Sequence, residues 1–181
     1  LRAGLVDADG TYRDFDPDAG SLFQLFSTPS HGCQVVIPAA ANVIARRVPI
    51  PVFGACLVDA IPDETLLALE DPLDLDRDGV SGRAAIVEDP ATGELRVGRF
   101  GWKAQHASLL VFGADAYRNE MGITSDLFPR EQSFGIDPEL MRLCDPIPDP
   151  EDVEEPATGR RGIDNFESFM KFLAPVGRGA I

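Results

Sequence analysis

Three aspartates alternate with other residues in a short acidic segment, residues 74–81, of sequence DLDRDGVS. Asp74, Asp76 and Asp78 occupy positions 1, 3 and 5 of a calcium-binding loop. Gly79 stands at position 6, where such a loop turns sharply, and the carbonyl of Val80 falls at position 7. Carboxylates this close repel one another unless a cation lies between them. The spacing therefore predicts a bound Ca²⁺.

The twelfth position of this loop holds Ala85 instead of the usual bidentate glutamate. A two-helix EF-hand is therefore not expected, and another ligand must close the site. Asp71, Glu88 or a water molecule could take that role, and we count Asp71 among the candidate metal ligands. The competing interpretation is a solvated acidic turn in which nearby arginines balance the charge.

A second segment, residues 98–106 (GRFGWKAQH), places an aromatic ring beside polar side chains. Trp102 is the only tryptophan, and Gln105 and His106 follow within four residues. Composition favours a tryptophan that anchors the core with its polar neighbours on the surface. The alternative is the wall of a redox site, in which the indole stacks on a cofactor or passes an electron.

The overall charge excludes several classes of partner. Sixteen Lys and Arg against 30 Asp and Glu give a formal charge of −14, so nucleic acid and anionic lipid are not expected partners. No apolar run approaches the ~18 residues of a membrane span. The cysteines, Cys33, Cys56 and Cys144, form neither CxxC nor CxxCH. One disulfide with one free thiol and three buried thiols both agree with the count.

The elements that must position these residues are short, because 15 prolines and 17 glycines interrupt the chain. Hairpins are predicted around the turns at 7–10 and 89–93, and helices over 39–46, 62–70, 103–121, 137–144 and 163–174. An extended passage that includes prolines follows the first of these helices, and residues 52–61 should be buried. The predicted class is irregular α+β, with mainly short helices, two β-hairpins and long Pro-rich loops. We expect an N-terminal hairpin and acidic loop over 1–26 and a central cation-loop domain over 27–181.

Five segments in order carry a family resemblance. They are RRVPIPVFGACLVDAIP (46–62), DPLDLDRDGVSGR (71–83), GRFGWKAQ (98–105), MGITSDLFP (121–129) and FMKFLAP (169–175). Together they resemble the bacterial di-haem c-type oxidoreductases, often labelled thiol oxidoreductases and distantly similar to di-haem cytochrome c peroxidases. The resemblance covers roughly residues 27–175 and implies a cytochrome-c-peroxidase-like central region.

The departures from this family concern haem attachment and one apolar passage. Members carry two CxxCH motifs, one on each side of the stretch seen here, and this chain has neither. Cys56 stands where the family usually has glycine, and Ile50 where a second proline is common. We expect a fragment from between two haem domains, or a relative whose haem lies on another chain. The beginning at Leu1 and the end at Ile181 favour the fragment.

The resemblance implies a periplasmic or secreted, haem-dependent redox protein that works with haem-bearing segments or chains and a small redox partner. It places Trp102 near a haem as an electron relay, and makes Gln105, His106 and Met121 candidates for the haem environment. Haem c is implied by the family, whereas the chain alone is expected to be inactive. The alternatives are a non-enzymatic, calcium-stabilised scaffold or binding module that has lost haem chemistry, and a cytosolic enzyme with Cys56 or Cys144 as nucleophile.

Overall fold

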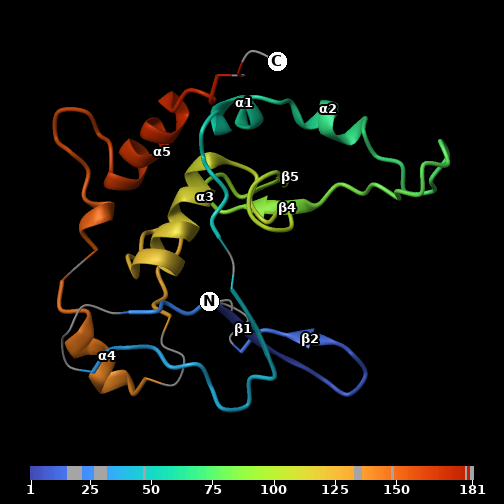
Figure 1. Ribbon diagram of the computed structural model, residues 1–181. Coiled ribbons are helices and arrows are strands. Elements are labelled where there is room, and N and C mark those ends of the chain that lie inside the picture. The colour runs from blue at the N-terminus through green and yellow to red at the C-terminus, as the bar shows by residue number, and fades with distance from the viewer. Residues whose placement is uncertain are drawn as a thin grey trace. The chain divides into compact units, whose positions relative to one another are not determined.

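The computed structural model describes residues 1–15, 22–26, 32–46, 48–132, 136–147, 149–177 and 179 (Figure 1). Two compact units are present, each built from two stretches of the chain. The first unit comprises Leu1–Ile50 and Ala114–Gly159, and the second comprises Pro51–Gly113 and Arg160–Ile181. The division after residue 26 stays a prediction, and part of its acidic loop, residues 16–21, lies outside the described residues.

A small antiparallel sheet lies in the first unit. Its strands are β1 (Arg2–Val6), β2 (Tyr12–Arg13) and β3 (Val43–Ala45), in the order β2-β1-β3. The turn between β1 and β2 closes through Gly10, whose φ of 86° suits glycine, and whose amide donates to the Asp7 carbonyl. This confirms the first predicted hairpin.

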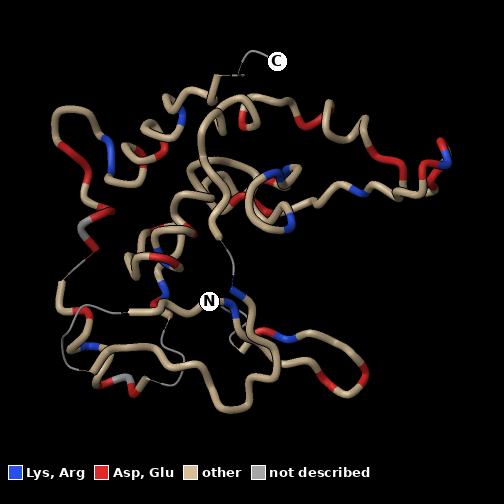
Figure 2. Tube along the Cα trace, in the orientation of Figure 1, with Lys and Arg blue, Asp and Glu red and all other residues tan. Residues whose placement is uncertain are grey.

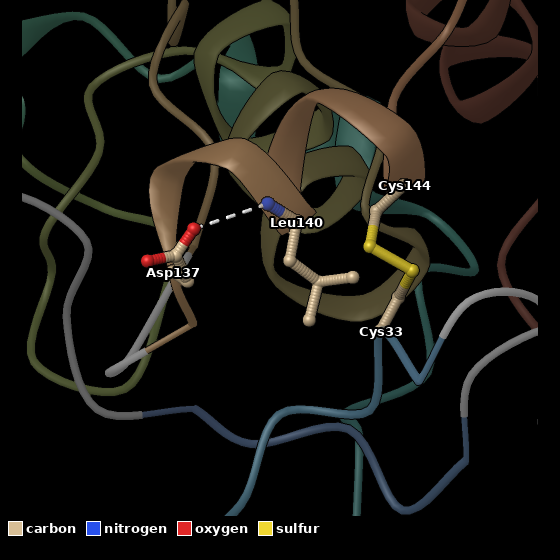
Figure 3. The surroundings of a disulfide bond; sticks show 4 residues. All are labelled: Cys33, Asp137, Leu140 and Cys144. Atoms are coloured by element: carbon tan, nitrogen blue, oxygen red, sulfur yellow. Dashed lines mark hydrogen bonds between the residues drawn. A yellow bond between two sulfur atoms is a disulfide. The ribbon is translucent and has the colours of Figure 1, made fainter.

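Three short helices complete the first unit. A π-helix, η1 (Tyr117–Met121), continues directly from α3 (Leu109–Ala116), and Gly122 ends it in the left-handed conformation. Helix α4 (Pro138–Cys144) begins as predicted with Pro in its first turn. The Asp137 side chain accepts the amide of Glu139 and also that of Leu140, which Figure 3 shows. A 3₁₀ turn, η2 (Pro150–Asp152), lies in the Pro-rich acidic segment.

The second unit combines a hairpin with helices. Strands β4 (Ile86–Asp89) and β5 (Glu94–Val97) pair antiparallel, which confirms the second predicted hairpin. Helices α1 (Ala55–Asp59) and α2 (Asp63–Leu67) precede it, and α5 (Gly162–Phe172) packs against α1. The core is built by Phe100, Leu109 and Met170, with partly buried apolar side chains around them.

Two segment predictions were wrong for local reasons. Residues 39–46 do not form a helix: residues 39–40 are a turn, and β3 pairs with β1, because Asn42 accepts from and donates to Val6 and holds the chain against that strand. Residues 52–61 contain α1 and are not buried as predicted, since Phe53 and Leu57 are 56% and 61% exposed.

The helix predicted over 103–121 begins later, at Leu109. Residues 100–106 instead close a tight turn, in which Phe100 and His106 exchange backbone hydrogen bonds of 3.0 and 3.1 Å. The Leu109 amide then donates to the Asp59 carboxylate, and the Ser108 hydroxyl accepts the Val111 amide. Helix α3 therefore begins after this turn and not within it, where the prediction placed the helix start.

The helices in the described ranges are all too short or too polar to serve as a membrane span. The α+β class with short helices, small antiparallel sheets and irregular connections is confirmed. Its likeness to cytochrome c peroxidases stays a prediction.

Candidate functional site

The acidic loop connects α2 to β4, and its charged residues lie together at the tip of this connection (Figure 2). A bridge between Asp71 and Gly82 closes its base, with the Asp71 amide donating to the Gly82 carbonyl at 3.1 Å. Asp71, Asp74 and Asp76 each offer a carboxylate oxygen, and these atoms lie within 4.8 Å of one another. Oxygen atoms at this separation can share one hard cation after a small adjustment.

Backbone amides already hold these carboxylates. Asp71 accepts the amides of Leu75 and Asp76 at 2.9 and 3.2 Å, and Asp74 accepts the Gly79 amide at 3.1 Å. Donation by backbone N–H groups lowers the pKa of Asp71, so the carboxylate is ionised at neutral pH. The positive φ of Asp74 (51°) and Gly79 (87°) bends the chain around the carboxylates.

Of the acids offered as closing ligand, Asp71 lies with Asp74 and Asp76. Asp78 is outside this three-carboxylate group, and its Oδ1 accepts the Val80 amide at 2.8 Å. Val80 is 64% exposed. Whether a cation binds here stays a prediction.

The turn over residues 98–106 presents its polar and aromatic side chains in different environments. Trp102 is 53% exposed, so the indole is not the core anchor that composition favoured. Gln105 is exposed, whereas the His106 ring is half-buried and lies 6.4 Å from the Phe112 ring. Gly98 is required here, because a Cβ at that position would meet the Ala104 carbonyl oxygen at 1.9 Å.

A residue that the sequence analysis missed, Arg99, holds this turn in place. Its side chain is 2% exposed and donates to the carboxylate of Asp63 and to the carbonyls of Asp59 and Ile61. Those carbonyls lie at the end of α1, where helix carbonyls lack partners within the helix. A lone arginine in an apolar stretch after a strand was the available signal.

Three groups of the chain interact with the carboxylate of Asp63. Burial opposes ionisation, but the Val97 amide at 2.8 Å and the guanidinium groups of Arg99 and Arg96 outweigh it, so the pKa of Asp63 is lowered. Helix α2, strand β5 and the turn after it are joined through this one side chain.

Met121, the remaining haem-environment candidate, belongs to the first unit, whereas Trp102, Gln105 and His106 belong to the second. It is the last residue of η1 and is 53% exposed. The structure therefore does not gather the four candidates within one compact unit.

The first unit shows which cysteines form a disulfide. Cys33 and Cys144 form a disulfide with a Cα–Cα distance of 5.7 Å, across 111 residues of sequence (Figure 3). Cys56 is a free, half-buried thiol. One bridge with one free thiol is thus the correct alternative.

The bridge lies in the wall of a cavity of about 290 Å³. An adjoining cavity of about 200 Å³ shares Gly122, Glu131 and Asp145 with it. One wall is built by amide side chains: Gln24 donates to the Asn119 carbonyl and to Gln132 at 2.6 and 3.1 Å.

The charges of these cavities are mostly negative. Burial raises the pKa of Glu131, and the nearby carboxylates of Asp145 and Asp149 raise it further, against the opposing effect of Arg118. Arg118 itself pairs with Asp115 at 3.3 Å and lies over the Phe128 ring at 4.7 Å.

The residues of this chain do not fit a covalently attached haem. Thioether attachment needs two nearby thiols, but the bridge uses two of the three cysteines and leaves Cys56 alone. What the chain offers instead is an exposed indole, a half-buried imidazole and an acidic loop.

These elements define an irregular α+β protein with a disulfide in its first unit and an acidic loop and an exposed tryptophan in its second. The family described as di-haem oxidoreductase, putative peroxidase, matches residues 37–139, which is more than half of the chain. The chain therefore belongs to the di-haem oxidoreductase family. Neither the curated proteins nor the solved structures contain a match.

Proposed function

We propose that this chain is the central portion of a periplasmic di-haem c-type oxidoreductase, acting in peroxidase-like or thiol-oxidising electron transfer. The observation that carries the proposal is the family match over residues 37–139, which includes both the acidic loop and the turn at 98–106. Membership implies haem, and the cysteines of this chain do not fit its attachment. The proposal therefore assigns the haems to other segments or chains, with this chain as part of their protein environment.

The disulfide supports the periplasmic part of the proposal. Disulfides persist in oxidising compartments and are rare in the reducing cytosol. The Cys33–Cys144 bridge joins residues 111 positions apart, so it constrains much of the first unit. The same bridge argues against the cytosolic enzyme with Cys144 as nucleophile.

Trp102 is the residue we propose as an electron relay toward a haem-bearing partner. Its indole is 53% exposed on a turn that Arg99 and Gly98 hold in position. An exposed tryptophan combines apolar contact area with a polar N–H, which suits a partner surface. Gln105 and His106, in the same turn, would flank that contact, and Met121, in the first unit, stays a separate candidate for a haem environment.

We also propose that the acidic loop binds Ca²⁺ as a structural ion. Asp71, Asp74 and Asp76 would supply the first oxygen ligands, because their carboxylates already converge. Asp78 and the Val80 carbonyl would join if the tip of the loop tightened around the ion. Such an ion would fix the excursion between α2 and β4 without taking part in electron transfer.

The native protein from its source is the material that tests the haem proposal. We expect an intense Soret band and a mass that exceeds the polypeptide by covalently bound haem. We also expect the isolated 181-residue chain to be colourless and to have the mass of the polypeptide alone. Colourless native material without added mass would contradict the proposal.

That negative result would instead support the second candidate, a calcium-stabilised scaffold or binding module. The observation that favours this candidate is the acidic loop itself, which is built without any haem-attaching residue nearby. It predicts a stabilising metal and no redox activity.

A further inference from the structure

We propose that the cavity of the first unit is a site of thiol–disulfide exchange, in which a small cationic thiol, an aminothiol, reacts with the Cys33–Cys144 bridge while the cavity carboxylates hold its ammonium group. This goes beyond the proposed haem function, because it needs only the chain's own sulfur atoms. It rests on where the bridge lies, on the charge of the lining and on the chemistry of disulfides.

The bridge is part of the cavity wall and not sealed in a core. Cys33 and Cys144 are both half-buried, and both line the cavity of about 290 Å³. Cys144 is the last residue of α4, and Figure 3 shows the two sulfur atoms at that end of the helix. Exchange requires a thiolate to reach one sulfur atom of the bridge, and the cavity that both cysteines line is the route we assign to it.

The lining selects for positive charge. Glu120, Glu131 and Asp145 line the cavity with Arg118 as its only lining cation among the described residues, and Asp149 and Glu151 line the adjoining one. Arg118 is engaged with Asp115. The field at the bridge is therefore negative, and it raises the local concentration of cations while it repels anionic thiols.

One carboxylate oxygen points to a missing partner. Oε2 of Glu151 is buried and accepts no hydrogen bond from the described residues, although burial without a partner is costly for a carboxylate. An ammonium group in the adjoining cavity would supply the donor. Met121 and Met141, which also line the larger cavity, offer apolar contact to the methylene groups of a thiol.

The exchange balances without any other reactant. A thiolate attacks one sulfur of the bridge, so a mixed disulfide forms, the Cys33–Cys144 bond breaks and the released thiolate takes a proton from water. A second aminothiol attacks the mixed disulfide and leaves as the small disulfide. Two electrons and two protons pass from two aminothiols to the chain, and the reverse reaction restores the bridge.

The test uses the folded, haem-free chain and three thiols that differ in charge: cysteamine, 2-mercaptoethanol and 3-mercaptopropionate. Mixed disulfides are quenched with acid and mapped by mass to Cys33, Cys144 or Cys56. The rate constant of each thiol with the chain is calculated per concentration of thiolate. It is then divided by the rate constant of the same thiol with a neutral reference disulfide, the disulfide of 2-mercaptoethanol. We expect adducts at the bridge, with cysteamine about tenfold faster than 3-mercaptopropionate.

Matched variants separate the cavity from the general charge of the chain. Glu131→Gln should reduce the ratio of the exchange rate with cysteamine to that with 3-mercaptopropionate. Glu94→Gln removes the same charge from an exposed position of β5 and should leave this ratio unchanged. High salt should also narrow the ratio.

Three results would overturn the proposal: a bridge that none of the thiols opens in the folded chain, an anionic thiol that reacts as fast as cysteamine, and equal effects of the two variants. None of them bears on the haem proposal, which is tested on the native protein.

Discussion

Arg99 shows how a single side chain organises the second unit. Its guanidinium is almost fully buried, and it satisfies carbonyls at the end of α1 while it pairs with Asp63. A buried charge is tolerated only when it is paired and hydrogen-bonded. Removal of the arginine would leave the carbonyls of Asp59 and Ile61 without this donor, and the Asp63 carboxylate with only the Val97 amide and the more distant Arg96.

We therefore expect Arg99→Met to lower the free energy of unfolding by about 3 kcal/mol, because Asp63 loses its nearest cation and partly buried carbonyls lose their donor. Arg99→Lys should recover only part of this loss, since an ammonium cannot donate in the planar fork of a guanidinium. Urea unfolding measures both. Arg142→Met, at an exposed pair with Glu139, is the control and should change stability by less than about 1 kcal/mol. Equal losses would contradict the role given to Arg99.

Glu131 provides a second residue-scale prediction, on pH. Its pKa is raised by burial and by Asp145 and Asp149, so folding favours the protonated form. Its contribution to stability is therefore complete below the ordinary carboxyl value of 4.5 and is lost as the pH rises through the raised value.

Glu131→Gln keeps the shape of the neutral acid and cannot ionise. We expect it to raise the thermal midpoint at pH 7 and to have little effect below pH 4.5. Melting curves across this range, with Glu94→Gln as the control, measure the difference. A midpoint that falls at pH 7 would show that the ionised carboxylate is stabilising.

At the scale of elements, the acidic loop has little apolar packing to hold it. It makes an excursion between α2 and β4 that is held at its base by the Asp71–Gly82 bridge, and its leucines are largely exposed. Its own amides turn the carboxylates inward, yet the like charges repel. A cation would remove that repulsion.

We expect a chelator to lower the melting temperature and Ca²⁺ to restore it, since an ion bound only by the folded chain stabilises it by mass action, about 2.7 kcal/mol at one hundred times the dissociation constant. The Asp74→Asn, Asp76→Asn double variant should lose this response. Asp9→Asn, in the turn of the first hairpin, should keep it. Identical melting curves with and without chelator, and no metal by elemental analysis, would leave the solvated acidic turn.

At the scale of the molecule, each compact unit is assembled from two distant stretches of sequence. The Cys33–Cys144 bridge joins the two stretches of the first unit, whereas the α1–α5 contact and the Phe100, Leu109 and Met170 core join those of the second. Long-range connections of this kind reduce the entropy of the unfolded chain or bury apolar area, and the bridge of the first unit is a covalent one.

Replacement of both bridged cysteines, Cys33→Ser with Cys144→Ser, should therefore lower the free energy of unfolding by about 2–5 kcal/mol. Near- and far-ultraviolet circular dichroism during urea unfolding measures the loss. Cys56→Ser, at the free thiol, is the control and should cost much less. A double variant as stable as the original chain would mean that packing alone holds the first unit together.

Local signals in the sequence were enough for several elements and for part of the site. The Asp-Gly turn, the Asp137-Pro138 helix start and the apolar face of α5 act within a few residues, so both hairpins, α4 and α5 were predicted correctly. The alternation of Asp74 and Asp76 with a turn-forming Gly79 likewise placed the acidic loop, and five ordered segments indicated the family.

Tertiary structure decided what depends on residues far apart in sequence. Strand β3 forms because β1 pairs with it, and α3 begins at Leu109 because the Asp59 carboxylate accepts its amide. Packing likewise sets the pairing of Cys33 with Cys144, the burial of Arg99 and the exposure of Trp102. Composition and spacing do not predict these features. The sequence alone determined which groups are present, and the fold decided which of them meet.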